Sequence, residues 1–156
     1  MAQIDLVKRS ELSSALSFVQ VDGNWTTIEG AVNSGSGLYY CQGFAISDET
    51  TALTTGTKLT VYLPVSLTDI TVAGCVTTAP TGAALVVDIH KAGTTIMTTN
   101  KIVIDVSEFT TNTAATPPTV TTTTYTAFDK LEFIIDTIGS TIAGAGVKIF
   151  IKGNIV

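Results

Sequence analysis

Side chains that branch at Cβ dominate this sequence and limit what it can fold into. Thr occurs 29 times, and Thr, Val and Ile together account for 59 of the 156 residues. These side chains are stiff at χ1, which suits a pleated sheet better than a helix. The chain is therefore expected to be mainly β. Only 13% of its residues are charged, so Thr hydroxyls are expected to take the place of charges on its water-facing strand positions.

From residue 38 onward, short apolar or alternating runs are separated by Gly, Pro, Asn and Asp. Nine strands are predicted, at residues 39–46, 58–63, 70–77, 84–90, 94–98, 102–106, 120–124, 131–136 and 147–155. Lys91-Ala92-Gly93 is typical of a tight hairpin turn in which Gly supplies a positive φ angle. Short strands without helices between them favour an antiparallel, jelly-roll-like β-sandwich over a parallel sheet. The Thr-rich stretch 119–126 fits either an edge strand or a surface loop.

The sequence predicts a division into two parts, an N-terminal region at 1–37 and a β domain at 38–156. Residues 1–21 carry apolar side chains at no regular period, which predicts an extended arm. Each large apolar side chain left in water forgoes about 1.5–3 kcal/mol, so a neighbouring subunit is expected to cover the arm, with the chain's own β body as the alternative. With two residues of the following helix, the candidate interface residues are Ile4, Leu6, Val7, Leu12, Leu16, Phe18, Val19, Trp25 and Ile28.

A short helix is predicted at 23–32, after the arm. Asp22 is a good N-cap, and Trp25, Ile28 and Val32 fall on one helical stripe. At that spacing Trp25 is interpreted as a packing anchor, and a role as a stacking platform for a sugar is the alternative.

Composition argues against several classes of protein. No apolar run exceeds five residues, so no transmembrane helix is expected. The 8 basic residues are scattered among 13 acidic ones, which argues against nucleic-acid binding. The N-terminal residues lack the uninterrupted apolar stretch of a signal peptide, so synthesis without secretion is expected. The two cysteines and the single histidine do not form a metal-binding pattern, and no metal or cofactor is expected.

Acidic residues and one histidine are the candidates for catalysis. Asp88 and His90 lie two apart in a predicted strand, so they share a face and can form a carboxylate–imidazole pair. That pair fits a general base, or else a structural hydrogen bond beside the hairpin, which is the preferred interpretation. Asp88, Asp105 and Asp136 each come late in an apolar run, and paired acids of this kind would suit glycoside hydrolysis. No catalytic residue is predicted from these patterns.

Glycines cluster at two places near the end of the chain, at residues 139–141 and 143–146. A phosphate-binding loop would require Gly-x-x-x-x-Gly-Lys-Ser/Thr before a helix, whereas Lys148 here enters a predicted strand. The cluster is interpreted as a tight turn of small residues.

Three stretches resemble, in the same order, a module common in bacteriophage fibre and decoration proteins. They are residues 79–96 with the hairpin Asp88-Ile89-His90-Lys91-Ala92-Gly93, the loop Thr113-Ala114-Ala115-Thr116-Pro117, and residues 128–149 with Gly139-Ser140-Thr141-Ile142-Ala143-Gly144-Ala145-Gly146. Residues 21–29 are similar to a short segment near the N-terminus of many phage tail and fibre proteins. The resemblance implies a jelly-roll body, usually a homotrimer, exposed on a virion and without catalytic residues.

The expected function is therefore that of a non-enzymatic virion protein, a capsid decoration or cement subunit made in the host cytoplasm and placed on the outer surface of the particle. Its expected partners are copies of itself in a homotrimer and the major capsid protein or other virion proteins. The alternative is a short head or tail fibre, or a tail tip, that binds a glycan receptor on the host through loops such as 110–119. An enzyme acting on surface polysaccharide is a remote third class.

Overall fold

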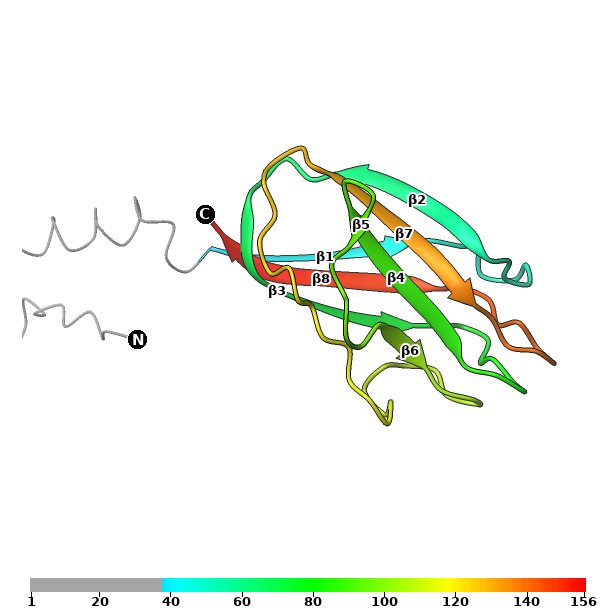
Figure 1. Cartoon of the computed structure of the whole chain (residues 1–156). Helices are drawn as coiled ribbons and strands as arrows, with labels where there is room; N and C mark the ends of the chain where they lie inside the picture. The colour runs from blue at the N-terminus through cyan, green and yellow to red at the C-terminus, as the bar shows by residue number, and fades with distance from the viewer. Residues whose placement is uncertain (1–37) are drawn as a thin grey trace, which may run out of the picture. The chain divides into compact units, whose positions relative to one another are not determined.

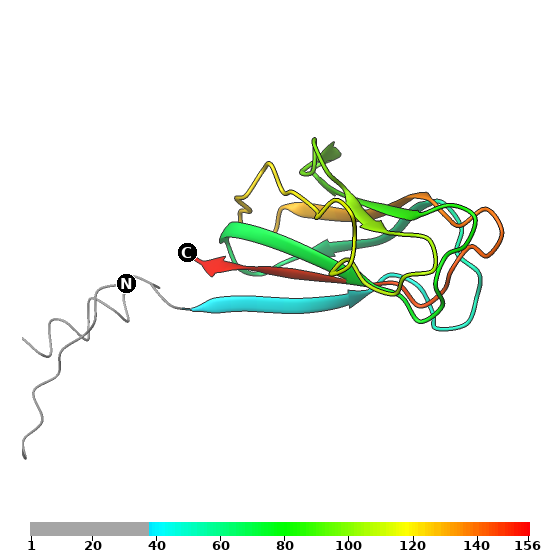
Figure 2. The same ribbon diagram turned by 90° about the horizontal axis from the view of Figure 1, so that it is seen from below.

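A computed structural model describes residues 38–156, of which Tyr39–Val156 form one unit made of two antiparallel sheets. Sheet A has three strands in the order β1-β8-β3, and sheet B has the order β2-β7-β4 with β5 and β6 both on the far edge of β4 (Figure 1). The strands are β1 Tyr39–Ala45, β2 Gly56–Tyr62, β3 Leu67–Cys75, β4 Leu85–Lys91, β5 Thr94–Thr95, β6 Ile102–Ile104, β7 Lys130–Thr137 and β8 Lys148–Ile155. Seen from below, the two sheets lie as two layers (Figure 2).

Alternating side chains on facing strands fill the space between the sheets. Leu85, Val87 and Ile89 of β4 are fully buried, as are the alternate residues Ile149 and Ile151 of β8. Because side chains in a strand point to opposite faces in turn, each of these strands presents one apolar face to the core. The layers touch through aromatic rings as well, since the ring of Phe44 in β1 lies 5.2 Å from that of Phe133 in β7.

The expectation of a mainly β chain with antiparallel pairing is confirmed for the described residues, which contain no helix. Eight of the nine predicted strands are present, most with ends shifted by one to three residues. Within the described part of the chain, no helix is long and apolar enough to cross a membrane. The predicted arm (1–21), the helix (23–32), the candidate interface residues from Ile4 to Ile28 and the boundary after residue 37 lie outside the described residues and stay predictions.

The prediction of a strand at 120–124 is wrong. The backbone of this segment forms hydrogen bonds with two different parts of the fold. The N–H groups of Thr121 and Thr122 both donate to the carbonyl of Ile96 beyond β5, at 2.8 and 3.2 Å. The carbonyl of Thr123 instead accepts the N–H of Ile70 in β3, at 3.2 Å. A segment that divides its hydrogen bonds in this way builds no continuous ladder with either sheet, and it is a loop.

The predicted hairpin turn is confirmed. Lys91 of β4 pairs with Thr94 of β5, leaving two residues in the turn. Ala92 has φ 49° and Gly93 has φ 82°, and two positive φ angles are those of a type I′ turn, whose twist matches the flanking strands. The positive φ angle predicted for Gly93 is present, and Ala92 adopts one as well.

Candidate functional site

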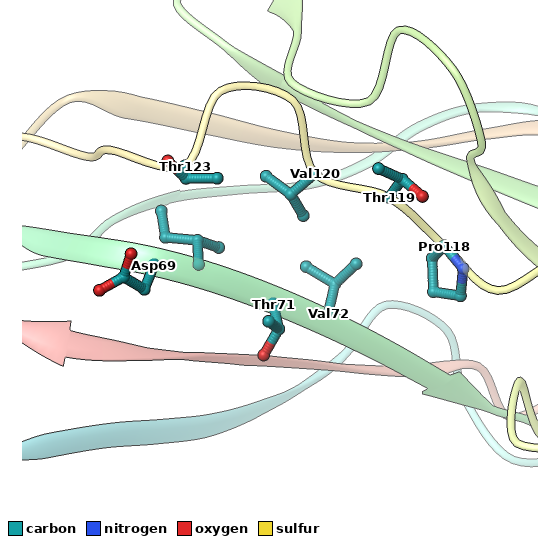
Figure 3. A pocket seen from close by; sticks show the side chains of 8 residues that line it. Asp69, Thr71, Val72, Pro118, Thr119, Val120 and Thr123 are labelled. Atoms are coloured by element: carbon teal, nitrogen blue, oxygen red, sulfur yellow. The ribbon is translucent and has the colours of Figure 1, made fainter.

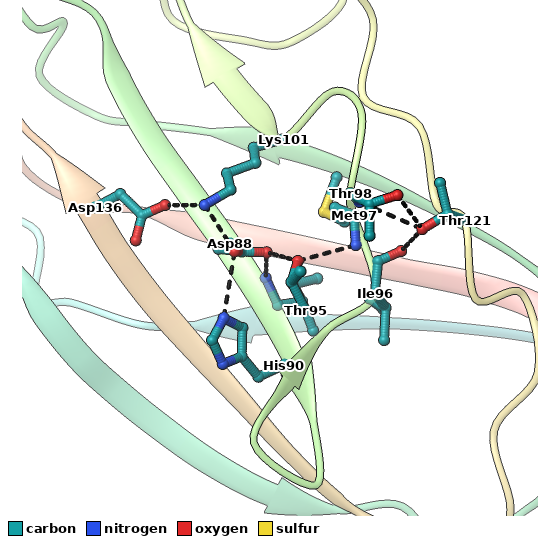
Figure 4. Close-up of polar contacts among 10 residues, drawn as sticks. Asp88, His90, Thr95, Ile96, Met97, Thr98, Lys101, Thr121 and Asp136 are labelled. Atoms are coloured by element: carbon teal, nitrogen blue, oxygen red, sulfur yellow. Dashed lines mark hydrogen bonds and ion pairs between the residues drawn. The ribbon is translucent and has the colours of Figure 1, made fainter.

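The acidic residue singled out in the sequence, Asp88, lies where the far edge of sheet B is interrupted. On that edge of β4, β5 ends with Thr95 opposite His90, and β6 begins with Ile102 opposite Val87. Asp88 therefore faces the gap between two short strands. Its side chain is 2% exposed, so water hardly reaches the carboxylate. Figure 4 shows the polar groups around it.

Four polar groups surround the carboxylate of Asp88. Its Oδ1 accepts the N–H of Ile89 at 2.8 Å and the hydroxyl of Thr95 at 2.6 Å. Its Oδ2 lies 2.8 Å from Nζ of Lys101 and 3.3 Å from Nε2 of His90. An ionised carboxylate offers about four lone-pair sites, and Ile89, Thr95 and Lys101 engage three of those of Asp88.

Lys101 joins this carboxylate to a second one. Its Nζ lies 2.6 Å from Oδ2 of Asp136 in β7 as well as 2.8 Å from Asp88. The pairing of β4 with β7 shifts register here, from Val86 opposite Thr137 to Val87 opposite Ile135, so Asp136 is an extra residue in β7. A β-bulge re-aims the side chain it carries, and this one brings Asp136 to Lys101. Hydrogen bonds to Asp136 and then to Asp88 raise the pKa of the Lys101 ammonium.

These contacts favour a structural role for Asp88 over that of a general base. Burial acts to raise the pKa of its carboxyl group, but the hydrogen bonds from Lys101, Thr95 and the Ile89 N–H outweigh burial and leave the pKa below its ordinary value. An efficient general base needs a pKa near the working pH and a free lone pair. In Asp105, the third acid considered, Oδ2 accepts a hydrogen bond from the N–H of Ala115 at 2.9 Å.

Only two members of this cluster follow from the sequence. Asp88 and His90 are predicted on one strand face, and the structure pairs them. Asp136 is predicted only as a possible acid, and no sequence signal points to Lys101 or Thr95. Thr95 and Lys101 reach Asp88, and Asp136 reaches Lys101, through the register of β5, β6 and β7 against β4, which no spacing along the chain contains.

A shallow groove of about 350 Å³ lies between β3 and the loop that follows Pro117. Four consecutive residues of β3 form one wall, and the other wall is the loop; the lining residues are Asp69, Ile70, Thr71, Val72, Pro118, Thr119, Val120 and Thr123 (Figure 3). The groove combines hydroxyls and one carboxylate with apolar surface. That mixture suits a polar ligand with apolar faces, such as a sugar.

Figure 1 shows one end of the two-sheet body where β1 begins and toward which β2 and β8 run. Four large apolar residues in or beside these strand ends, Tyr39, Tyr62, Phe128 and Val156, are each more than half exposed, and together they are called the end patch. Exposed aromatic and aliphatic side chains on a surface of low charge are typical of a protein–protein contact.

Phe128 is the unusual member of the end patch. It is 67% exposed and has φ 64°, a left-handed conformation that bulky side chains rarely adopt. It is the third residue of a turn closed by the N–H of Asp129 donating to the carbonyl of Thr126 at 3.0 Å. A positive φ angle at that place normally belongs to Gly, so the backbone here is strained and the aromatic ring is held in water.

Within residues 38–156, no three His, Cys, Asp or Glu side chains gather in a way that could hold a metal ion. Comparison of the chain with models of protein families, with curated proteins and with solved structures found no match.

Proposed function

We propose that this chain is a structural protein of a bacteriophage particle, a decoration or cement subunit on the outer surface of the capsid. The β body forms a homotrimer, and the arm at 1–21, together with the end patch of the β body, fastens it to the shell or to a neighbouring virion protein. A subunit that binds only the assembled lattice stabilises that lattice by mass action.

The strand order supports the jelly-roll body that the phage resemblance implies. The first strand pairs with the last (β1 with β8), the second with the next to last (β2 with β7), and β4 pairs with β5 at the centre of this nesting. The nesting continues between the β2–β7 pair and the β4–β5 pair, where Leu67 of β3 forms an antiparallel bridge with Tyr125 of the 119–126 loop. A long hairpin that rolls up on itself gives this nested pairing in two facing sheets, which is the jelly-roll arrangement.

The conformation of Phe128 is the strongest support for a protein contact at the end patch. A left-handed conformation costs about 1–2 kcal/mol for a side chain with a Cβ, and strain of this kind collects at functional sites. An exposed ring recovers little of that cost inside its own subunit. Contact with a partner explains why an aromatic residue occupies a position that suits Gly.

Replacing Phe128 by Gly should therefore separate stability from attachment. In Phe128→Gly, the free energy of unfolding should stay unchanged or rise by about 1 kcal/mol, because Gly adopts a positive φ angle without strain. Binding to particles that have been stripped of the protein should fall at least tenfold, since aromatic anchors carry much of an interface's energy. Denaturant unfolding and co-sedimentation with the particles measure the two effects.

Phe109→Ala is the matched control for this experiment. Phe109 is 53% exposed but lies outside the end patch, so its removal should leave particle binding within twofold of the original. Full binding by Phe128→Gly, or an equal loss in Phe109→Ala, would count against the end patch as the site of attachment.

The groove beside β3 favours a second candidate, a short fibre or tail tip that binds a host glycan. The carboxylate of Asp69 and the hydroxyls of Thr71 and Thr119 can hydrogen-bond sugar hydroxyls, and Pro118 and Val120 offer apolar contact. An enzymatic role has less support, because Ile89, Thr95 and Lys101 already engage the carboxylate of Asp88.

Copy number in the particle separates these two candidates. A decoration subunit covers the shell, so on a stained gel of purified particles it should give a band comparable with that of the major shell protein. A fibre or tail tip occupies few positions. A faint band, with the chain confined to one end of the particle by antibody labelling, would replace the decoration role by the receptor-binding one.

A further inference from the structure

The two sheets have four lateral edges, and three of them are protected against pairing with another chain. The outer edge of β3 is covered by loop backbone, with Ile70 bonded to Thr123 and Gly74 to Thr111. The far edge of β4 carries only the short strands β5 and β6. The outer edge of β2 is interrupted by a bulge at Lys58. Loop cover, short strands, bulges and lysines are the usual devices that stop edge-to-edge association.

Within residues 38–156, the fourth edge, that of β1, has none of these devices. Its seven residues, Tyr-Tyr-Cys-Gln-Gly-Phe-Ala, include no charge and no Pro. They pair with β8 in seven consecutive steps without a bulge. Five of the seven are exposed. A flat, uncharged edge strand of this length is a template for one more strand.

The backbone groups that face the open edge can be identified from the hydrogen bonds on the other side. The N–H of Ile46, directly after β1, donates to the carbonyl of Val147 at 2.9 Å, so Ile46 faces the β8 side. Facing alternates along an antiparallel strand. The N–H and C=O groups that point to the open edge are therefore those of Tyr39, Cys41, Gly43 and Ala45.

Among the described residues, the carbonyl of Gly43 on this edge has a side-chain donor in place of a strand partner. It accepts a hydrogen bond from Nε2 of its own neighbour, Gln42, at 3.0 Å. An exposed side chain that turns back onto the adjacent carbonyl is easily displaced. A backbone N–H arriving from another strand would replace it at little cost.

We infer that β1 pairs antiparallel with β1 of a second copy of this chain, about a twofold axis at Gln42, so that two copies of sheet A join into one six-stranded sheet. This register opposes Cys41 to Gly43 of the second copy and Tyr39 to its Ala45. It is the register that uses all four edge-facing residues of each strand. A shift of the axis to Cys41 or Gly43 would leave one of them without a partner.

The side chains in this register complement one another. On the outer face of sheet A, each larger residue meets a smaller one: Tyr39 meets Ala45, and Cys41 meets Gly43. On the inner face, Tyr40 meets Phe44, and the two Gln42 side chains meet at the axis. Aromatic cross-strand pairs stabilise a ladder by about 0.2–1 kcal/mol each. Neither strand carries a charge that would repel its copy, which favours a second copy over a partner selected by charge.

A ladder of seven residues is a small contact, below the area of interfaces that persist in dilute solution. The pairing closes after two copies, so it differs from the homotrimer contact proposed above, and it does not depend on the role in a particle. Where many copies are held side by side, their high local concentration would maintain the contact and join neighbouring trimers.

Disulfide trapping tests this pairing on the purified full-length protein. In a Cys41→Ser, Cys75→Ser background, Gln42→Cys places two thiols opposite each other at the axis. Facing residues of this type have Cα atoms about 4.5 Å apart, which lies within the range that a disulfide spans. Under mild oxidation, a dimer that reducing agent reverses should form at least tenfold faster than in Thr60→Cys, which is exposed on the edge strand β2.

A blocking substitution provides the second arm. Adding Cys41→Pro in place of Cys41→Ser removes an N–H that faces the open edge and not β8, so the fold should be retained while cross-linking falls to the Thr60→Cys rate. If the Pro variant does not fold by circular dichroism, Cys41→Glu serves instead, because it puts a charge on the edge beside Lys152 of β8. Equal rates for Gln42→Cys and Thr60→Cys, or undiminished cross-linking in the blocked variant, would overturn the inference.

Discussion

Asp88→Ala should lower the free energy of unfolding by about 2–4 kcal/mol, because removing one partner of a buried ion pair leaves the others unsatisfied. The Ile89 N–H and the Thr95 hydroxyl would lose their acceptor in a site that water hardly reaches. Lys101 would keep Asp136 and some solvent, which limits the loss. Denaturant unfolding at neutral pH measures the difference.

Asp88→Asn shows how much of this loss is due to charge. The amide keeps the shape and can still accept from Thr95 or Ile89, so the loss should be roughly half that of Ala. The pKa of Asp88 in the folded protein lies below its ordinary value of 3.8, so the unfolded chain takes up the proton first as the pH falls. The stabilisation is therefore complete well above pH 3.8 and is lost as the pH falls through the folded value.

The difference in stability between the original protein and Asp88→Asn should accordingly shrink below about pH 4. A difference that stayed constant down to pH 3 would mean that the ionised carboxylate contributes nothing beyond its shape. An Asp88→Ala variant as stable as the original would show that the gap between β5 and β6 closes without the ion pair.

Gly139→Ala should cost about 3–5 kcal/mol, among the largest effects of a single substitution. A Cβ at this position would lie 1.8 Å from the carbonyl oxygen of Ile142 and 2.8 Å from the backbone nitrogen of Thr81. Both atoms belong to backbone that is hydrogen-bonded together, Thr81 N–H to Ile142 O at 3.0 Å. No side-chain rotation relieves this clash, so the turn between β7 and β8 must open.

Ser140→Ala is the control, since it changes an exposed residue of the same turn and should shift stability by less than about 0.5 kcal/mol. Thermal unfolding followed by circular dichroism compares the two. Equal stability of Gly139→Ala and the original protein would show that the turn relaxes freely and that its backbone pairing with Thr81 is not needed.

Local chemistry in the sequence was enough to predict most strands and the hairpin at Ala92-Gly93. Branched residues with regular turn signals locate a strand within a few residues, because both effects act between neighbours in the chain. The prediction of a strand at 120–124 was wrong because it, too, considered only neighbours in the chain. The Thr residues of this segment suit a strand, but Ile96 and Ile70 both bond to it, and their positions are decided by tertiary structure.

The Asp88 cluster shows which contacts the sequence predicts and which it does not. The pairing of Asp88 with His90 follows from a period of two along one strand, and it was predicted. Lys101 reaches Asp88 only because β6 pairs with β4 in a particular register, and Asp136 reaches Lys101 only because β7 has a bulge. The strained Phe128 had no signal in the sequence, where it is one apolar residue before an acid.

The position of β8 has a consequence for how the molecule is made. This strand lies between β1 and β3 in sheet A, yet it follows both in the chain. While the ribosome is still adding residues before Lys148, β1 and β3 lack the strand that joins them into a sheet, and their apolar sides are open to aggregation. Sheet A must therefore assemble late, through contacts between distant residues, which makes folding slow. Chaperones that shield nascent chains should raise its soluble yield more than they do for a protein whose middle strand emerges first.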